Sequence, residues 1–129
     1  MVLAIDYDQT FSDYPEQFTK VREMFQAIGA TVYLVTARDE ETERIDPKHN
    51  AILSGFDKII YTSGKAKAGF VRADIFIDDS LSNVLKCQKS GLPALLFHTE
   101  RTADFPMFKV FSLNKDEIID SYLFMKKYA

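Results

Sequence analysis

The chain has 129 residues, 47% of them hydrophobic and 27% charged, which is ordinary for a globular protein with a substantial core. Its formal net charge of −3 gives no support for a broad nucleic-acid surface but leaves a local basic patch open, and no apolar stretch is long enough to cross a membrane. We therefore expect residues 1–129 to form a single domain. The single cysteine, Cys87, cannot form an internal disulfide, so we expect a cytoplasmic location and a small core residue at that position.

Apolar runs and amphipathic segments alternate along the chain. The apolar runs predict strands at residues 2–5, 31–35, 58–61, 74–77 and 94–97, with a small further strand at 110–111. Helical spacing predicts helices at residues 15–28, 47–53, 80–90 and 114–127, the first with a buried face of Phe18, Val21, Phe25 and Ile28. Because the strands are apolar on both faces, we predict an α/β fold: a three-layer, Rossmann-like parallel sheet with helices on both faces.

Carboxylates stand directly after two of these strands. Asp6 and Asp8 follow the first strand, and Asp78-Asp79 follows the fourth. Acidic residues often form turns after strands, and for either segment alone that explanation is sufficient. Two buried strands that both end in acids instead predict one shared cation site, because such a charge cluster is costly unless a cation or hydrogen bonds neutralise it.

The order of polar residues after the strands resembles that of the haloacid dehalogenase superfamily of phosphotransferases. Asp6-x-Asp8-x-Thr10 follows the first strand, and Thr36 follows the second. Lys65 and Lys67 follow the third strand, and Asp78-Asp79 follows the fourth. The resemblance extends from Val2 to about Phe97 and implies a phosphatase. A lone Thr or Lys would indicate little, so the order and placement of all four motifs carry the resemblance.

The resemblance assigns a role to each acid. Asp6 would be the nucleophile that forms an aspartyl phosphate, and Asp8 would be the general acid and base. Mg²⁺ would be the cofactor, because it prefers oxygen ligands. It would be held by the Asp6 side chain, the Asp8 backbone carbonyl and Asp78, with Asp79 nearby as a further or water-mediated ligand.

The remaining candidates would contact the phosphate. Thr36 would donate its hydroxyl to a phosphoryl oxygen, and one lysine would neutralise the transition state. We favour Lys67 over Lys65 for this role, because small relatives often have Gly-x-x-Lys here and Gly64 stands in that position. Arg38 would meet an anionic substrate or lie on the surface.

Each of these residues has a structural alternative. Thr36 would otherwise cap a turn, and we expect Thr10 to stabilise the turn that aims Asp8. His98 is more simply a structural histidine, and His49 a helix surface residue.

The spacing of the motifs leaves no room for an inserted cap domain on either side of Thr36. We therefore expect an open site, with specificity supplied by a large phosphorylated substrate, such as a macromolecule, or by a second subunit of a homo-oligomer. The rival from another class is a non-hydrolytic phosphoacceptor or binding module on a similar α/β fold. A receiver domain of that kind has its acidic pair at the first strand and its lysine at the fifth, which differs from the order in this chain.

Overall fold

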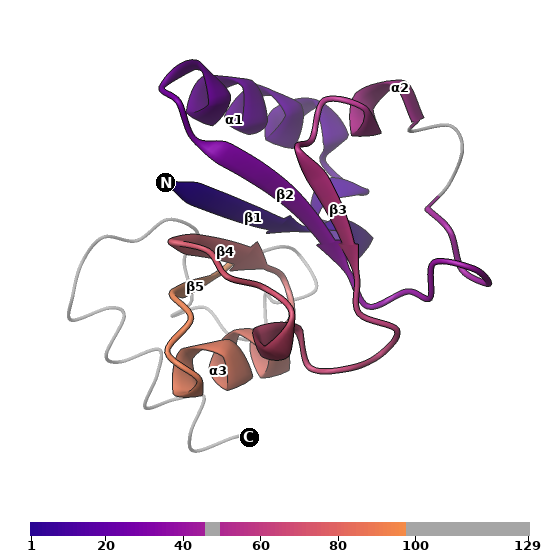
Figure 1. Cartoon of the computed structure of the whole chain (residues 1–129), viewed down its shortest axis with the longest axis vertical. Coiled ribbons are helices and arrows are strands. Elements are labelled where there is room, and N and C mark those ends of the chain that lie inside the picture. Colours follow the sequence, from indigo (N-terminus) through magenta and orange to yellow (C-terminus); the bar gives the residue numbers. More distant parts are fainter. Residues whose placement is uncertain (46–49, 98–129) are drawn as a thin grey trace.

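A fully parallel, five-stranded sheet forms the centre of the protein. The computed structural model describes residues 1–45 and 50–97. The strands are β1 (Val2–Asp6), β2 (Thr31–Thr36), β3 (Lys58–Tyr61), β4 (Ile75–Asp78) and β5 (Ala94–Leu96), in the order β3-β2-β1-β4-β5. Helices α1 (Pro15–Ala27) and α2 (Asn50–Leu53) lie on one face and α3 (Leu81–Lys89) on the other (Figure 1). The predicted α/β fold with a parallel sheet between helical layers is confirmed.

Strands β1, β2, β3 and β4 each contribute to a hydrophobic cluster on both faces of the sheet. Along β1, Leu3 and Ile5 pack in the cluster that α1 covers, whereas Ala4 packs in the cluster that α3 covers. All three side chains are fully buried. Cys87 belongs to the α3 cluster, so the expectation of a small core residue is confirmed, and burial raises the pKa of its thiol to about 11.

The strand order reverses at β1, and this reversal positions the polar residues. The chain proceeds from β1 outward to β2 and β3, and then returns to place β4 on the other side of β1. The connections diverge at this point, so ligands of open parallel sheets bind beyond the carboxyl ends of the strands there. Asp6 and Asp78 are the last residues of the two strands that flank the reversal.

Two details of the predicted elements differ from the structure. Strands β1, β2 and β4 each end one residue later than expected, and β5 ends one residue earlier. The added residues of β1 and β4 are the first carboxylates of the two acidic motifs. Ile28 was expected on the buried face of α1 but is 73% exposed. The helix ends at Ala27, and the chain then turns through Gly29 at φ 89°, so the helical spacing no longer applies at Ile28.

Several expectations lie outside the described residues. They concern the start of the helix expected at 47–53, His49, His98, the strand at 110–111 and the helix at 114–127. Within residues 1–45 and 50–97, no helix is long and apolar enough to cross a membrane.

Asp57 joins the first residues of β3 to β2 and α1. Its carboxylate accepts a hydrogen bond from the Val32 N–H at 2.7 Å and another from the Gln26 side chain at 3.2 Å. The Asp57 N–H also donates to the Val32 carbonyl at 3.0 Å. The Val32 N–H is the main cause of the lowered pKa of Asp57, so the ionised carboxylate contributes to folding.

We predict that Asp57→Ala lowers the free energy of unfolding by on the order of 1 kcal/mol at pH 7, because these exposed bonds are partly screened by water. A lowered pKa gives stability that is present above the unfolded value of about 3.9 and is lost as the pH falls through the folded value. The difference between wild type and variant in urea unfolding should therefore shrink below about pH 4. A difference that stays constant down to about pH 2 would contradict this account.

Candidate functional site

The carboxyl ends of β1 and β4 bring three carboxylates together. The two strands pair in parallel with Ile5 opposite Ile77, so Asp6 and Asp78 follow as neighbours. Their exposed fractions are only 2% and 0%. Oxygen atoms of Asp6, Asp78 and Asp79 all lie within 4.8 Å of one another. The acids that sequence placed after two separate strands thus form one cluster.

Lys67 inserts its ammonium between two of these carboxylates. Its Nζ donates to Asp6 Oδ1 and, at 2.9 Å, to Asp78 Oδ2. The lysine begins a short 3-10 helix, Lys67–Gly69, and is 6% exposed. Lys65 is exposed and makes neither contact. The structure therefore places Lys67, the lysine favoured from the sequence, against the acids.

The loop before Lys67 is fixed to the end of β2. Thr62 donates its N–H to the Thr36 carbonyl at 2.9 Å, and Gly64 donates to the Ala37 carbonyl at 2.7 Å. Gly64 has φ +77°, a left-handed conformation that residues with a side chain rarely adopt. These bonds hold the third motif beside the second and direct Lys67 toward the sheet.

Burial and mutual charge set the protonation of this cluster. Burial is the largest cause of the raised pKa of Asp6, and Asp78 adds to it, whereas Lys67 opposes both. For Lys67, burial alone would lower the pKa, but Asp6 and Asp78 together raise it above the ordinary value. The lysine is thus held as a cation. Three ionised carboxylates outnumber the one ammonium, so the cluster then carries a net negative charge.

Thr10 connects the two acidic motifs. Its hydroxyl lies 3.0 Å from Asp6 Oδ2 and 3.2 Å from Asp79 Oδ1, and it accepts the Asp79 N–H at 3.2 Å. Sequence reasoning had assigned Thr10 to the turn that aims Asp8. The contacts show instead that Thr10 fixes Asp6 relative to Asp79, because it is fully buried between them.

The turn that carries Asp8 is held by Ser12. Residues Tyr7–Phe11 form one helical turn that Asp8 and Gln9 interrupt, with Asp8 extended at ψ 123° and Gln9 left-handed at φ 66°. Ser12 donates its N–H to the Tyr7 carbonyl at 2.9 Å and accepts the Gln9 N–H on its side chain at 2.8 Å. This interruption turns the Asp8 carboxylate away from Asp6 and toward the end of β2.

Asp8 belongs to a second cluster with Thr36 and Arg38. The Thr36 hydroxyl donates to Asp8 Oδ2 at 3.0 Å. Arg38 makes a bidentate ion pair with Asp8, with Nη2 at 2.7 Å from Oδ1 and Nε at 3.1 Å from both oxygens. Arg38 is therefore part of the site, not an unrelated surface residue.

Arg38 is also held by groups other than Asp8. Its Nη1 donates to the Arg44 carbonyl at 3.1 Å, and its guanidinium lies 5.3 Å from the centre of the Tyr7 ring. Hydrogen bonds to Asp8 are the largest cause of the raised pKa of Arg38. The side chain is about a third exposed, at 31%, so a ligand can reach it from solvent.

Sequence reasoning missed two residues that hold Asp78. Ser80 donates its N–H to Asp78 Oδ1 at 2.8 Å, and Asn83 donates its side-chain amide to Oδ2 at 3.2 Å. The Ser80 side chain accepts the Asn83 N–H at the start of α3. A capping serine followed three residues later by a polar side chain was a visible signal, because the first turn of such a helix faces the preceding strand end.

The expected openness of the site is correct for Asp8 and wrong for Asp6. The Asp8 side chain is 41% exposed and lines a 550 Å³ cavity with Ala37, Arg38 and Glu43. The Asp6 side chain is only 3% exposed, because Lys67 and Thr10 lie against its two oxygens. The short spacing between the motifs argued against an inserted cap domain. It did not exclude that side chains in contact with Asp6 cover its carboxylate.

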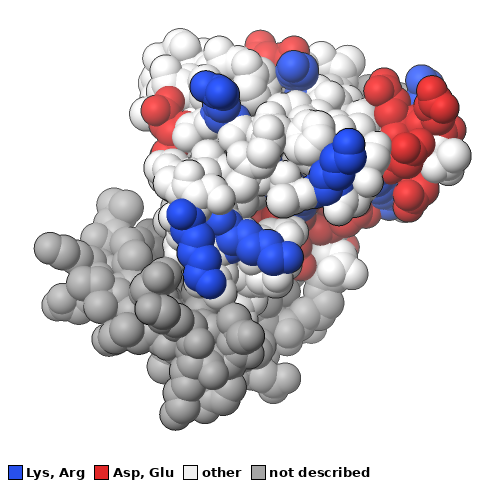
Figure 2. Space-filling model, turned by 60° about the horizontal axis from the view of Figure 1, so that its bottom comes forward, with Lys and Arg blue, Asp and Glu red and all other residues white. Residues whose placement is uncertain are grey.

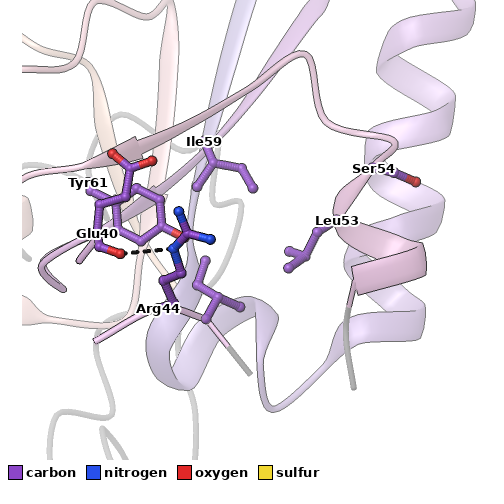
Figure 3. A pocket seen from close by; sticks show the side chains of 7 residues that line it. Glu40, Arg44, Leu53, Ser54, Ile59 and Tyr61 are labelled. Atoms are coloured by element: carbon purple, nitrogen blue, oxygen red, sulfur yellow. Dashed lines mark hydrogen bonds between the residues drawn. The ribbon is translucent and has the colours of Figure 1, made fainter. Parts of the chain in front are cut away.

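A second cavity lies beyond Arg44, at the carboxyl end of β3. Its volume is 360 Å³, and Figure 3 shows Glu40, Arg44, Tyr61 and Ile59 on one side of it and Leu53 and Ser54 on the other. The Arg44 Nε donates to the Glu40 carbonyl at 3.1 Å, so this side chain folds back along its own loop. None of the acids Asp6, Asp8, Asp78 and Asp79 lines this cavity.

The donor set of the acid cluster fits a small divalent cation. Asp6, Asp78 and Asp79 supply carboxylate oxygens, which Mg²⁺ prefers, and they carry more negative charge than Lys67 neutralises. No protein-family model matches the chain, and no curated protein matches it. The functional argument therefore depends on this geometry and on the order of the motifs.

We predict that Lys67→Met destabilises the protein by about 3–5 kcal/mol in a metal-free buffer, because it leaves Asp6 and Asp78 buried without a counter-charge. Lys65→Met is the matched control and should change the unfolding free energy by less than about 0.5 kcal/mol. Urea denaturation of both variants measures the difference. Equal effects at the two positions would show that the buried ion pairs do not hold the site together.

Proposed function

We propose that this protein is a Mg²⁺-dependent phosphomonoester hydrolase of the haloacid dehalogenase type, without a cap domain, that acts through an aspartyl phosphate. The observation that carries the proposal is Asp6, a buried carboxylate at the strand reversal that contacts a buried lysine and lies beside two further acids. An acid in this setting can attack phosphorus while neighbouring cations neutralise the charge on the phosphoryl oxygens.

The chemistry divides between Asp6 and Asp8. An Asp6 oxygen forms a bond to phosphorus as the ester P–O bond breaks, and Asp8 gives a proton to the departing alkoxide. Asp8 then takes a proton from water, whose oxygen attacks phosphorus and releases inorganic phosphate and free Asp6. The exposed side chain of Asp8, set apart from Asp6 by the interrupted turn, suits a group that exchanges protons with substrate and water.

Mg²⁺ would be held by Asp6, Asp78 and Asp79, with the Asp8 backbone carbonyl as the further ligand that the resemblance implies. When bound, it would supply the positive charge that three carboxylates and a phosphate require. Ser80 and Asn83 would keep the Asp78 carboxylate in orientation, because each already donates a hydrogen bond to it.

When substrate binds, Lys67 would leave Asp6 and Arg38 would leave Asp8, and both would bind the substrate anion. Lys67 covers Asp6, so it must move from Asp6 toward the phosphoryl oxygens before Asp6 can attack. Arg38 holds Asp8 through both carboxylate oxygens, and a substrate anion offers the guanidinium an alternative partner. Release of Asp8 by Arg38 would let Asp8 take up and transfer a proton. Thr36, whose hydroxyl donates to Asp8, would instead donate to a phosphoryl oxygen, as the resemblance implies.

Substrate specificity would come from groups other than a cap domain. The described connection from β1 to β2 contains one turn and α1, and no described part of the connection from β2 to β3 is longer than a loop with α2. A macromolecular phosphorylated substrate or a second subunit of a homo-oligomer would then cover the cavity beside Asp8 and Arg38.

We predict that Asp6→Asn lowers Mg²⁺-dependent hydrolysis of phosphomonoesters by a factor on the order of 10³ or more, because an amide is a poor nucleophile. The assay measures steady release of inorganic phosphate, and continued release also distinguishes a hydrolase from a phosphoacceptor module. Asp13→Asn, at an exposed acid in the next turn, is the control and should retain activity. Unchanged turnover in a folded Asp6→Asn protein would refute the mechanism.

We predict that Asp8→Asn slows phosphoryl transfer from alkyl phosphates to Asp6 by about a hundredfold or more and from 4-nitrophenyl phosphate by much less. The reason is that nitrophenolate leaves without a proton, whereas an alkoxide needs one. Parallel measurements of kcat/KM on both substrates give the comparison, because this ratio does not include the later hydrolysis of the aspartyl phosphate. An equal loss on both would argue against Asp8 as the general acid.

A further inference from the structure

A further pocket, which Lys67 also lines, contains two other lysines. It has a volume of 140 Å³, more than the roughly 30 Å³ that one water occupies in the liquid. Lys65, from the loop after β3, and Lys86, from α3, line it together with Lys67. No acidic residue is among the described residues that line it.

The two outer lysines have charge available for a ligand. Lys67 is committed to Asp6 and Asp78, but Lys65 and Lys86 are exposed. Within the described part of the chain, neither of them forms an ion pair with a carboxylate. They stand 21 positions apart in sequence, and the fold brings both to one small concave surface.

The lining of this pocket is otherwise small. Ala37, Gly64, Ala66 and Ala68 contribute little or no side chain, so the space between the lysines stays free. Asn83, which also lines the pocket, donates its amide to Asp78. A carboxylate or phosphate group is small enough for this space, which lysines from the loop after β3 and from α3 line together.

The pocket is adjacent to the proposed phosphoryl site. It shares Lys67 with the acid cluster, and Ala37 follows Thr36 directly and lines the cavity of Asp8 as well. A substrate that places its phosphoryl group at Asp6 can therefore extend past Ala37 into the lysine pocket.

Charge on the opposite side of Asp8 disfavours a second anion there. The loop after β2 carries Asp39, Glu40, Glu41 and Glu43, and Glu43 lines the cavity of Asp8. Figure 2 shows acidic side chains gathered at the side of this face where the segment after β2 lies, with Lys and Arg side chains nearer the centre. The surface thus repels anions on one side of the site and attracts them on the other.

We propose that the pocket of Lys65 and Lys86 binds a second anionic group of the substrate, a carboxylate or a phosphate, on its leaving-group side. This proposal rests on the proposed hydrolase function and narrows its substrate class to phosphomonoesters with a second negative group. The two ammonium groups hold that group by charge-assisted hydrogen bonds while Asp6 faces the phosphoryl group.

The test compares three matched substrates with Mg²⁺: propyl phosphate, 3-(phosphonooxy)propanoate and 1,3-propanediol bisphosphate, each with its longer homologues. We expect kcat/KM to be at least about tenfold higher for members of a series with a second anion than for the alkyl phosphates. Preference for the carboxylate or for the bisphosphate series identifies which anion the pocket takes.

Variants then assign the preference to the pocket. The double variant Lys65→Gln/Lys86→Gln should lose most of the preference through a higher KM for the dianionic compounds. Lys89→Gln is the matched control, because Lys89 is an exposed lysine of the same helix that does not line the pocket. It should leave the ratio unchanged.

The outcomes separate this proposal from the hydrolase function. Hydrolysis of all series without preference, or a preference that survives in the double variant, overturns the pocket proposal and leaves the hydrolase intact. An equal loss of preference in Lys89→Gln also overturns it, because the effect would then come from general surface charge. Absence of hydrolysis of every compound, in wild type as in Asp6→Asn, overturns both.

Discussion

The ammonium of Lys67, buried between Asp6 and Asp78, is the interaction on which the rest of the site depends. Two parallel strands that end in buried carboxylates would bring like charges together away from bulk solvent, which is costly. Lys67 offsets this cost with two ion pairs and is itself held as a cation by them. The loop before Lys67 must be fixed to the sheet, and its backbone hydrogen bonds to the Thr36 and Ala37 carbonyls fix it there.

The same arrangement explains why the structure is suited to bind positive charge. Three carboxylates share one lysine, so the cluster has negative charge that a divalent cation would neutralise. It also implies that Lys67 is both a stabilising residue and a cover over Asp6. Arg38 has the corresponding position over Asp8, and it is more exposed and closer to solvent. An anionic substrate would compete with the two aspartates for the two cations, which couples substrate binding to the release of both reactive groups.

Much of this arrangement could be predicted from sequence because it follows from the backbone. Apolar runs located β1 and β4, and parallel strands of an α/β sheet bring their carboxyl ends to one edge, so Asp6 and Asp78 were expected to meet there. The choice of Lys67 over Lys65 followed from the Gly-x-x-Lys pattern of the resemblance, and Lys67 is the lysine that contacts Asp6 and Asp78.

The features of the site that were not predicted depend on side-chain contacts between segments whose relative positions the sequence does not indicate. The ion pair of Arg38 with Asp8 spans 30 positions and needs the interrupted turn at Gln9, which no apolar pattern predicts. The near-complete burial of Asp6 was missed because it arises from Thr10 and Lys67 and not from an inserted domain. The role of Ser12 in the turn, first attributed to Thr10, likewise depends on two hydrogen bonds of a single short loop.

The central claim, that Asp6 becomes covalently phosphorylated, is tested most directly by trapping the intermediate. The Asp8→Asn protein would be mixed with Mg²⁺ and radiolabelled 4-nitrophenyl phosphate, quenched with acid and reduced with borohydride, which converts an acyl phosphate to an alcohol. The account predicts acid-stable label before reduction and, by peptide mass mapping after it, homoserine in place of Asp6 alone. Phosphate release without trapped label, or reduction at a different residue, would contradict it.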